Sequence, residues 1–206
     1  MKIFLKLNFD DFPKSTLPDN AVKFVEANSK KTLYISYIKW VIIVAIIMEI
    51  IIHLICNIFH WNADIYEGVN YISIVLLIIS IIPHEIIHLM GFGKGGFSNS
   101  TLYLGLVICA VHCTKPVSKR RFIFLSILPT LCFGVIPFAI WIIYIHNTDL
   151  GVILLKFSFY SILAGCGDFI NIKNAITQMP KGSMQQLSGM NSYWYLADTT
   201  GEGEHQ

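Results

Sequence analysis

The stretch Pro83-His84-Glu85-Ile86-Ile87-His88 places three ionisable side chains in a run of sequence that is otherwise almost entirely apolar. On an α-helix, His84 and His88 lie one turn apart and project from the same face, separated by about 40° of rotation. Two imidazoles on one face can bind one zinc ion, and a glutamate between them can serve a zinc-bound water. The motif therefore predicts a zinc site that still needs a third ligand.

The composition around this stretch is typical of an integral membrane protein. Of the 206 residues, 54% are hydrophobic and only 14% are charged, whereas a soluble domain carries about 25% charged residues. The net charge of +2 is too small to indicate a nucleic-acid partner. The five cysteines lie mostly in or beside apolar runs, so we expect free thiols, and the N-terminus lacks the apolar core of a signal peptide. We expect an all-α integral membrane protein in contact with the lipid bilayer.

Four apolar runs are long enough to cross ~30 Å of hydrocarbon. They lie at about residues 37–59, 71–92, 122–145 and 150–172. We expect residues 1–206 to form a single membrane-embedded domain, with a cytosolic arm at residues 1–36 and a cytosolic tail at residues 173–206. Residues 101–113 are apolar but too short for an ordinary span, so we expect a strand, a hairpin or a re-entrant segment between the second and third spans. Pro129 and Pro137 predict kinks in the third span.

The distribution of positive charge gives one consistent topology. Seven of the fifteen Lys and Arg residues lie in residues 1–39 and five in residues 94–121, while the connection at residues 60–70 has none. Because basic residues concentrate on the cytoplasmic side, we expect a multi-pass protein of the cell membrane with both termini cytoplasmic. In this topology His84 and His88 lie near the inner end of the second span, and Asp168 lies at a similar depth on the fourth.

Asp168 is the best candidate for the missing ligand. Within the predicted spans the only acidic residues are Glu49, Glu85 and Asp168, and Asp168 alone matches the depth of the histidines and follows small residues that let helices approach closely. We expect Zn²⁺ on His84, His88 and Asp168, with Glu85 as the general base that takes a proton from the zinc-bound water. The alternatives are a polar network between helices without a metal and an interfacial Asp168 at a helix end.

Other polar residues in the apolar runs have weaker interpretations. Glu49 and His53 are four residues apart in the first span, and we expect a mutually satisfied pair that faces a neighbouring helix or, alternatively, a functional pair. Asn171 follows Asp168 by three residues and is either a partner of the site that supports a ligand or an oxyanion, or a solvated helix end. A rival metal cluster at Cys109, His112 and Cys113 fits no standard zinc spacing.

These residues resemble two groups of known proteins. His84-Glu85-Ile86-Ile87-His88 with a later Asp168 is similar to the motif of site-2 protease-type intramembrane zinc metallopeptidases. Most of the chain resembles a family of small bacterial membrane proteins described as zincin peptidases, which share the HExxH helix, a basic stretch (here KPVSKRRF) before a proline-containing span with Pro129, and the late Gly167-Asp168 pair. The resemblance implies peptidase chemistry with zinc. The CGDFIN context of Asp168 departs from the Leu-Asp-Gly of the site-2 proteases.

Three functions remain open at this point. The favoured one is a zinc-dependent metallopeptidase that cleaves a membrane-anchored peptide or protein near the cytoplasmic face, with residues 101–113 adding an extended substrate as a strand. The alternative is a non-enzymatic metal-binding or ion-handling membrane protein that uses Glu49, His53 and the two histidines of the motif along one polar track. The third is a catalytically silent relative that acts as a partner protein.

Overall fold

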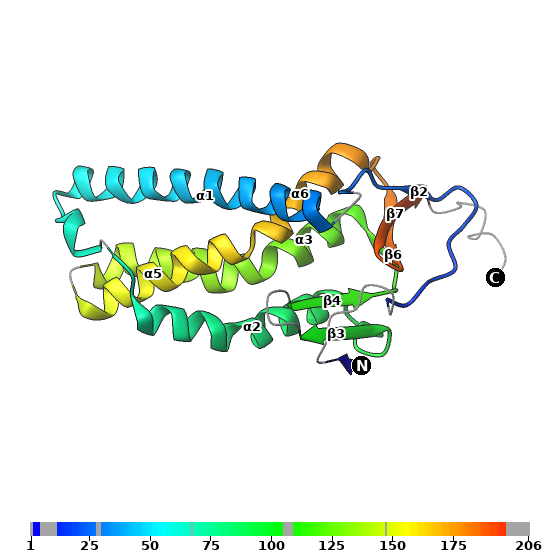
Figure 1. Ribbon diagram of the computed structural model, residues 1–206, viewed down its shortest axis with the longest axis horizontal. Helices are drawn as coiled ribbons and strands as arrows, with labels where there is room; N and C mark the ends of the chain where they lie inside the picture. The colour runs from blue at the N-terminus through cyan, green and yellow to red at the C-terminus, as the bar shows by residue number, and fades with distance from the viewer. Residues whose placement is uncertain are drawn as a thin grey trace, which may run out of the picture. The chain divides into compact units, whose positions relative to one another are not determined.

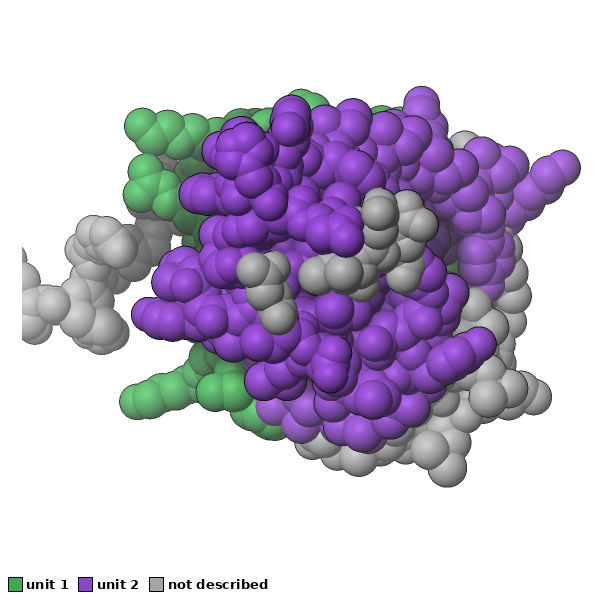
Figure 2. Space-filling view, turned by 90° about the vertical axis from the view of Figure 1, so that its left-hand side faces the viewer, with its two compact units in different colours: residues 1–26, 88–126, 171–206 green, residues 27–87, 127–170 purple. Residues whose placement is uncertain are grey.

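The computed structural model describes residues 2–4, 12–27, 30–66, 68–104, 109–146 and 148–196. The chain forms two compact units, each assembled from segments that are distant in sequence (Figure 2). The helical unit consists of Ala27–Ile87 and Ile127–Ile170, and the mixed unit consists of Met1–Glu26, His88–Ser126 and Asn171–Gln206. The prediction of one membrane-embedded domain stays a prediction.

Long apolar helices make up the helical unit (Figure 1). The elements that lie in it or enter it are α1 (Lys30–Phe59), η2 (Ala63–Tyr66), α2 (Tyr71–Gly91), α3 (Lys119–Thr130), η3 (Leu131–Val135), α4 (Ile136–Ile140), η4 (Trp141–Ile145), α5 (Asp149–Ala164) and α6 (Cys166–Gln178). In the described part of the chain, three helices are long and apolar enough to cross a membrane, and a fourth span exists if the bent pair α5 and α6 is counted as one. Only 17% of the most apolar 18-residue segment of α1 is buried within the described part of the chain, so most of its apolar side chains lie on the surface.

The third predicted span is one helical run that changes its winding. It begins at Lys119 and continues to Ile145, with π-helical turns at Leu131–Val135 and Trp141–Ile145. Pro129 and Pro137 each remove one backbone donor from this run. The wider turns lie just beyond the two prolines, where the regular hydrogen-bond ladder has already been interrupted.

The fourth predicted span is broken, which corrects the expectation of one helix over residues 150–172. Helix α5 ends at Ala164, and α6 begins at Cys166 with its axis bent by 47°. Gly165 lies at the break, and a Cβ atom built there would come within 2.5 Å of Thr130 Oγ1. The close approach of Thr130 therefore requires glycine at this position.

Hydroxyl groups that donate to backbone carbonyls of neighbouring helices join several helices of the helical unit. The Ser158 hydroxyl donates to the Gly134 carbonyl at 2.7 Å, and the Ser73 hydroxyl donates to the Ile153 carbonyl at 2.7 Å. A buried cluster joins α1, η2, η4 and α5; its members are Ile52, Cys56, Tyr66, Trp141 and Leu155.

Two small sheets in the mixed unit show that the all-α prediction is wrong for the rest of the chain. One sheet has the order β1-β3-β4, from Lys2–Phe4, Ser100–Leu104 and Cys109–Cys113, with β1 parallel and β4 antiparallel to β3. The other has the order β2-β7-β6-β5, from Val22–Lys23, Asn191–Leu196, Ser183–Ser188 and Val117–Ser118. The predicted segment at residues 101–113 is therefore a pair of antiparallel strands, and residues 105–108 between them lie outside the described part of the chain.

The predicted polar tail forms a β-hairpin, with β6 and β7 joined by a tight turn. Ser188 pairs with Asn191, so Gly189 and Met190 form the connection, and Gly189 has the positive φ (58°) that a two-residue hairpin turn needs. The predicted arm contributes β1 and β2, and its residues 5–11 lie outside the described residues. Helices and sheets of the mixed unit enclose a core of Phe24, Phe92, Cys113, Val117, Phe122, Leu125, Ala175 and Met179.

Candidate metal centre

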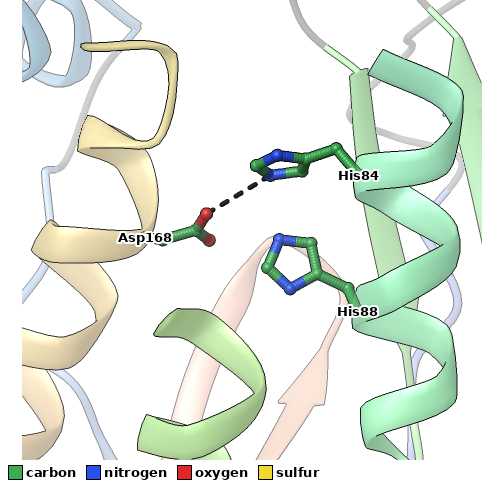
Figure 3. A group of neighbouring side chains, drawn as sticks. All are labelled: His84, His88 and Asp168. Carbon is green, nitrogen blue, oxygen red and sulfur yellow. Dashed lines mark ion pairs between the residues drawn. The ribbon is translucent and has the colours of Figure 1, made fainter. Parts of the chain in front are cut away.

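Helix α2 presents both histidines of the motif on one face, one turn apart. Figure 3 shows the two imidazole rings pointing toward the carboxylate of Asp168, which α6 carries. His84 Nε2 lies 3.4 Å from Asp168 Oδ2, and these two side chains are 20% and 13% exposed. His88 is 9% exposed. The site is thus mostly withdrawn from solvent and keeps a small opening.

The three side chains can offer one ligand atom each to a common ion. These atoms all lie within 4.8 Å of one another. With zinc–ligand bonds of ~2.0–2.1 Å, two ligands of a tetrahedral ion are ~3.4 Å apart. The distance of 3.4 Å between His84 Nε2 and Asp168 Oδ2 equals this ligand-to-ligand separation. The donor set, two imidazoles and one carboxylate, leaves a fourth position open, as in catalytic zinc sites.

A backbone carbonyl fixes the orientation of His88. Its Nδ1 lies 2.9 Å from the Leu125 carbonyl oxygen in a buried contact. A carbonyl can only accept, so Nδ1 carries the proton and donates it. The tautomer is thereby set with Nε2 unprotonated, which is the form that binds a metal. Gly91 makes the contact possible, because α2 comes so close to α3 that a Cβ atom there would lie 2.6 Å from Leu125 Cβ.

The bend at Gly165 places Asp168 in the first turn of α6. The Asp168 backbone N–H donates to the Gly165 carbonyl at 3.0 Å. Backbone N–H groups at a helix start favour an anionic side chain nearby, so the position suits a carboxylate ligand. Sequence reasoning placed Asp168 at the depth of the histidines, but it did not find Leu125, Gly91 or Gly165 as supports of the site. Nothing in a single sequence marks which carbonyl a histidine will meet.

The other candidate residues have different environments. Glu85 is 7% exposed on α2, and its catalytic role stays a prediction, as does the supporting role of Asn171. Glu49 and His53 do pair, with His53 Nδ1 3.8 Å from Glu49 Oε2, but the two side chains are 49% and 64% exposed. The expectation that they face a neighbouring helix is therefore wrong for the described part of the chain.

The rival cluster of Cys109, His112 and Cys113 lies partly outside the described residues. Among the described residues, the group of three potential metal ligands is His84, His88 and Asp168. His112 donates through Nε2 to the Gly189 carbonyl at 2.9 Å and stacks on Phe12. Burial lowers the pKa of His112 below its ordinary value. Cys113 is a buried free thiol, and the Cys109 side chain lies outside the described part of the chain. The other described cysteines, Cys56, Cys132 and Cys166, are also free, as predicted.

Comparison with known proteins gives one match. The model of a family described as "Putative zincin peptidase" matches residues 76–184, more than half of the chain. The matched range contains His84, Glu85, His88 and Asp168 together with the Leu125 carbonyl. No curated protein and no solved structure matches the chain.

Proposed function

The chain belongs to the family described as "Putative zincin peptidase", and from this premise we propose that it is a membrane-embedded zinc metallopeptidase. Its substrate is a membrane-anchored peptide or protein that is hydrolysed near the cytoplasmic face. The family implies zinc, and His84, His88 and Asp168 are the residues that would hold it. The observation that carries the proposal is the meeting of these three donors, which come from two helices about eighty residues apart in sequence.

When bound, zinc polarises a carbonyl oxygen and lowers the pKa of a water molecule. The chain's own contribution to proton transfer is Glu85, which directly follows His84 on α2. Its carboxylate accepts a proton from the attacking water and returns it to the amine nitrogen as the peptide C–N bond breaks. Buried surroundings strengthen the electrostatic contacts that hold the reacting groups in place.

The membrane placement rests on helix composition and charge. Three helices, or four with the bent pair, are apolar and long enough to span, and the basic residues favour cytoplasmic termini. The sheet suggests how an extended substrate would bind. Among the described strands, β3 is paired on both sides, and β1 and β4 are the edges of this sheet, so a substrate strand would add to β4.

The test uses purified protein in lipid vesicles with a library of single-span peptides, and cleavage products are identified by mass spectrometry. Wild type should cleave in a zinc-dependent manner. Glu85→Gln should keep zinc and lose activity by at least ~100-fold, the usual contribution of a general base. Asp149→Asn, at the start of α5, is the control and should cleave normally. Equal cleavage by Glu85→Gln and wild type would refute the assignment of Glu85.

A further inference from the structure

A polar stripe runs along the exposed side of α1. The side chains of Glu49 and His53 are exposed, and Asn57 and His60 continue the exposed stripe toward the end of the helix. Toward the start, Ile46 and Ile42 lie within about 60° of the rotation of Glu49, and they are 55% and 54% exposed. Met48, Ile52 and Cys56, which are 7%, 5% and 2% exposed, form the buried side of α1. The stripe is therefore not part of the packing within the helical unit.

The depth of the stripe makes it costly in lipid. Residues 40–59 are apolar except for Glu49, His53 and Asn57, and at 1.5 Å per residue they cover ~30 Å of hydrocarbon. Glu49 lies at the midpoint of this run. Ionisable side chains at that depth almost always have polar partners, because leaving them in hydrocarbon is unfavourable.

The pair on α1 satisfies itself only in part. His53 Nδ1 donates to the Glu49 backbone carbonyl at 2.8 Å, whereas the Glu49 carboxylate oxygen is 3.8 Å from that nitrogen. That distance is too long for a hydrogen bond. Within the described residues, the carboxyl group and His53 Nε2 both remain available to a partner.

We propose that α1 forms a parallel helix pair with α1 of a second copy of this chain, through the stripe Ile42, Ile46, Glu49, His53, Asn57 and His60. The proposal rests on the membrane placement proposed above and goes beyond the peptidase site. Two copies inserted with the same topology bring α1 and its symmetry mate together in parallel, so each residue lies at the depth of its own counterpart, and Glu49 of one helix reaches His53 one turn further along the other. The carboxyl group of Glu49 forms one hydrogen bond with Nε2 of the partner's His53, and the two-fold axis repeats this bond.

The spacing of the stripe fits a helix pair. Its residues recur at intervals of four, three, four, four and three, close to the alternation that keeps one seam facing a partner. The second copy is favoured over an unrelated helix because the stripe carries both the acidic group and its imidazole partner. It is therefore complementary to itself.

Cross-linking in native membranes tests the proposal with two adjacent positions. Ile46→Cys lies on the stripe, and Ile47→Cys lies about 100° away on the same turn with a similar exposure, 49% against 55%. A bifunctional maleimide should link Ile46→Cys into a dimer and leave Ile47→Cys at the wild-type level. Equal linking at both positions, or dimer bands at neither, would overturn the stripe as the interface.

A second test measures the association of two labelled copies in vesicles by fluorescence energy transfer. Glu49→Leu with His53→Leu should weaken dimerisation by roughly tenfold or more, because each interhelical polar contact in a membrane contributes ~1 kcal/mol. Unchanged association in this double variant would also overturn the proposal. The membrane placement is tested separately: a membrane-impermeant maleimide that labels both cysteines fully in intact vesicles would show that α1 is not in lipid.

A second observation stands apart from the first. The Leu125 carbonyl, which accepts from His88 Nδ1 at 2.9 Å, lies in α3 four residues before Pro129. In an α-helix that carbonyl would accept the backbone N–H of residue 129, and proline has none. The proline ring also crowds the carbonyl four residues earlier and turns it away from the helix axis.

We infer that Pro129 is a positioning residue for the metal site: it frees the Leu125 carbonyl for His88. The inference rests on the proposed zinc site and predicts a defect in Pro129→Ala, which restores the competing N–H. Pro137→Ala is the matched control, because Pro137 is buried in the same helical run and the carbonyl it frees belongs to Phe133.

Two measurements that do not depend on peptidase activity test the role of Pro129. Zinc affinity by chelator competition should fall roughly tenfold in Pro129→Ala, the lower end of what loss of an outer-shell partner costs, and stay at the wild-type value in Pro137→Ala. In zinc-free protein, ¹⁵N spectra of the His88 ring should show a smaller Nδ1–H population in Pro129→Ala alone. Wild-type affinity and an unchanged tautomer in Pro129→Ala would overturn the inference. Absence of zinc binding in wild type would instead refute the proposed function, and the zinc-free spectra would still decide the role of Pro129.

Discussion

Replacing Gly165 by alanine should damage both the bend before α6 and the metal site. The new Cβ would lie 2.5 Å from Thr130 Oγ1, well inside van der Waals contact. Thr130 is 4% exposed, and its β-branched side chain has few alternative rotamers in a helix. Forcing a methyl group into such a contact costs about 1–3 kcal/mol. Alanine also favours a continuous helix more than glycine does, so the chain has a second reason to straighten.

Straightening would move Asp168, which lies three residues after Gly165. Its carboxylate is 3.4 Å from His84 Nε2. After a displacement of about one or two ångströms, the Asp168 carboxylate and the two histidines could no longer all reach one ion at bonding distance. We therefore expect Gly165→Ala to lower zinc affinity by more than roughly tenfold, a loss in the range caused by disturbing the support of a metal ligand.

The matched control is Gly167→Ala, because a Cβ atom at Gly167 meets nothing within 4 Å. That variant should bind zinc normally and gain about 0.5–1 kcal/mol of helix stability. Zinc affinity is measured by chelator competition, and stability by urea unfolding in detergent. Thr130→Ala in the Gly165→Ala background should restore part of both losses if the clash is the cause. Equal stability and equal zinc affinity in the Gly165 and Gly167 variants would refute the reasoning.

Two further predictions concern the mixed unit. Gly91→Ala places a Cβ atom 2.6 Å from Leu125 Cβ, so it should cost about 1–3 kcal/mol and weaken zinc binding through the His88 contact; unaltered affinity by chelator competition would contradict this. Glu26 accepts a hydrogen bond from the Ser192 N–H at 3.3 Å, and burial raises its pKa above the ordinary 4.5. Because the pKa of Glu26 is higher in the folded state, its contribution to stability is complete below the ordinary pKa and is lost as the pH rises through the raised pKa. Amide hydrogen exchange at Ser192 should therefore accelerate with pH by more than the intrinsic chemical rate does. Glu26→Gln should remove this additional acceleration. Exchange at Ser192 with the same pH dependence in both proteins would count against it.

The positions of the long helices follow from the sequence because each is marked by an apolar run of about twenty residues, a signal that many residues share. Residues 71–92 were predicted as a span, and α2 ends at Gly91. The first span was predicted from residue 37, but α1 begins at Lys30, since the polar turn before a span can remain helical beyond the hydrocarbon. The pairing of His84 with Asp168 follows from two short motifs and a depth argument, so most of the donor set was predictable.

The remaining features depend on contacts between distant segments. The break at Gly165 is set by Thr130, which is 35 residues away in sequence. Gly165 and Gly167 permit a break, but a single sequence does not tell that a distant side chain requires one. The hairpin β6–β7 did carry local signals, in Gly189 at the turn and in the aromatic residues of β7, but its polar character suggested a tail. The exposure of Glu49 and His53 was not predictable, because a single sequence does not tell which face of α1 the other helices cover.

The central claim is that His84, His88 and Asp168 hold one zinc ion. It is tested most directly by zinc content and affinity in purified wild type, His84→Ala, Asp168→Ala and Glu85→Gln. We predict one zinc per chain in wild type and in Glu85→Gln, and a loss of affinity of more than ~100-fold in the two ligand variants, because removal of a ligand costs more than removal of its supporting partner. Zinc held at wild-type affinity by Asp168→Ala would contradict the assignment.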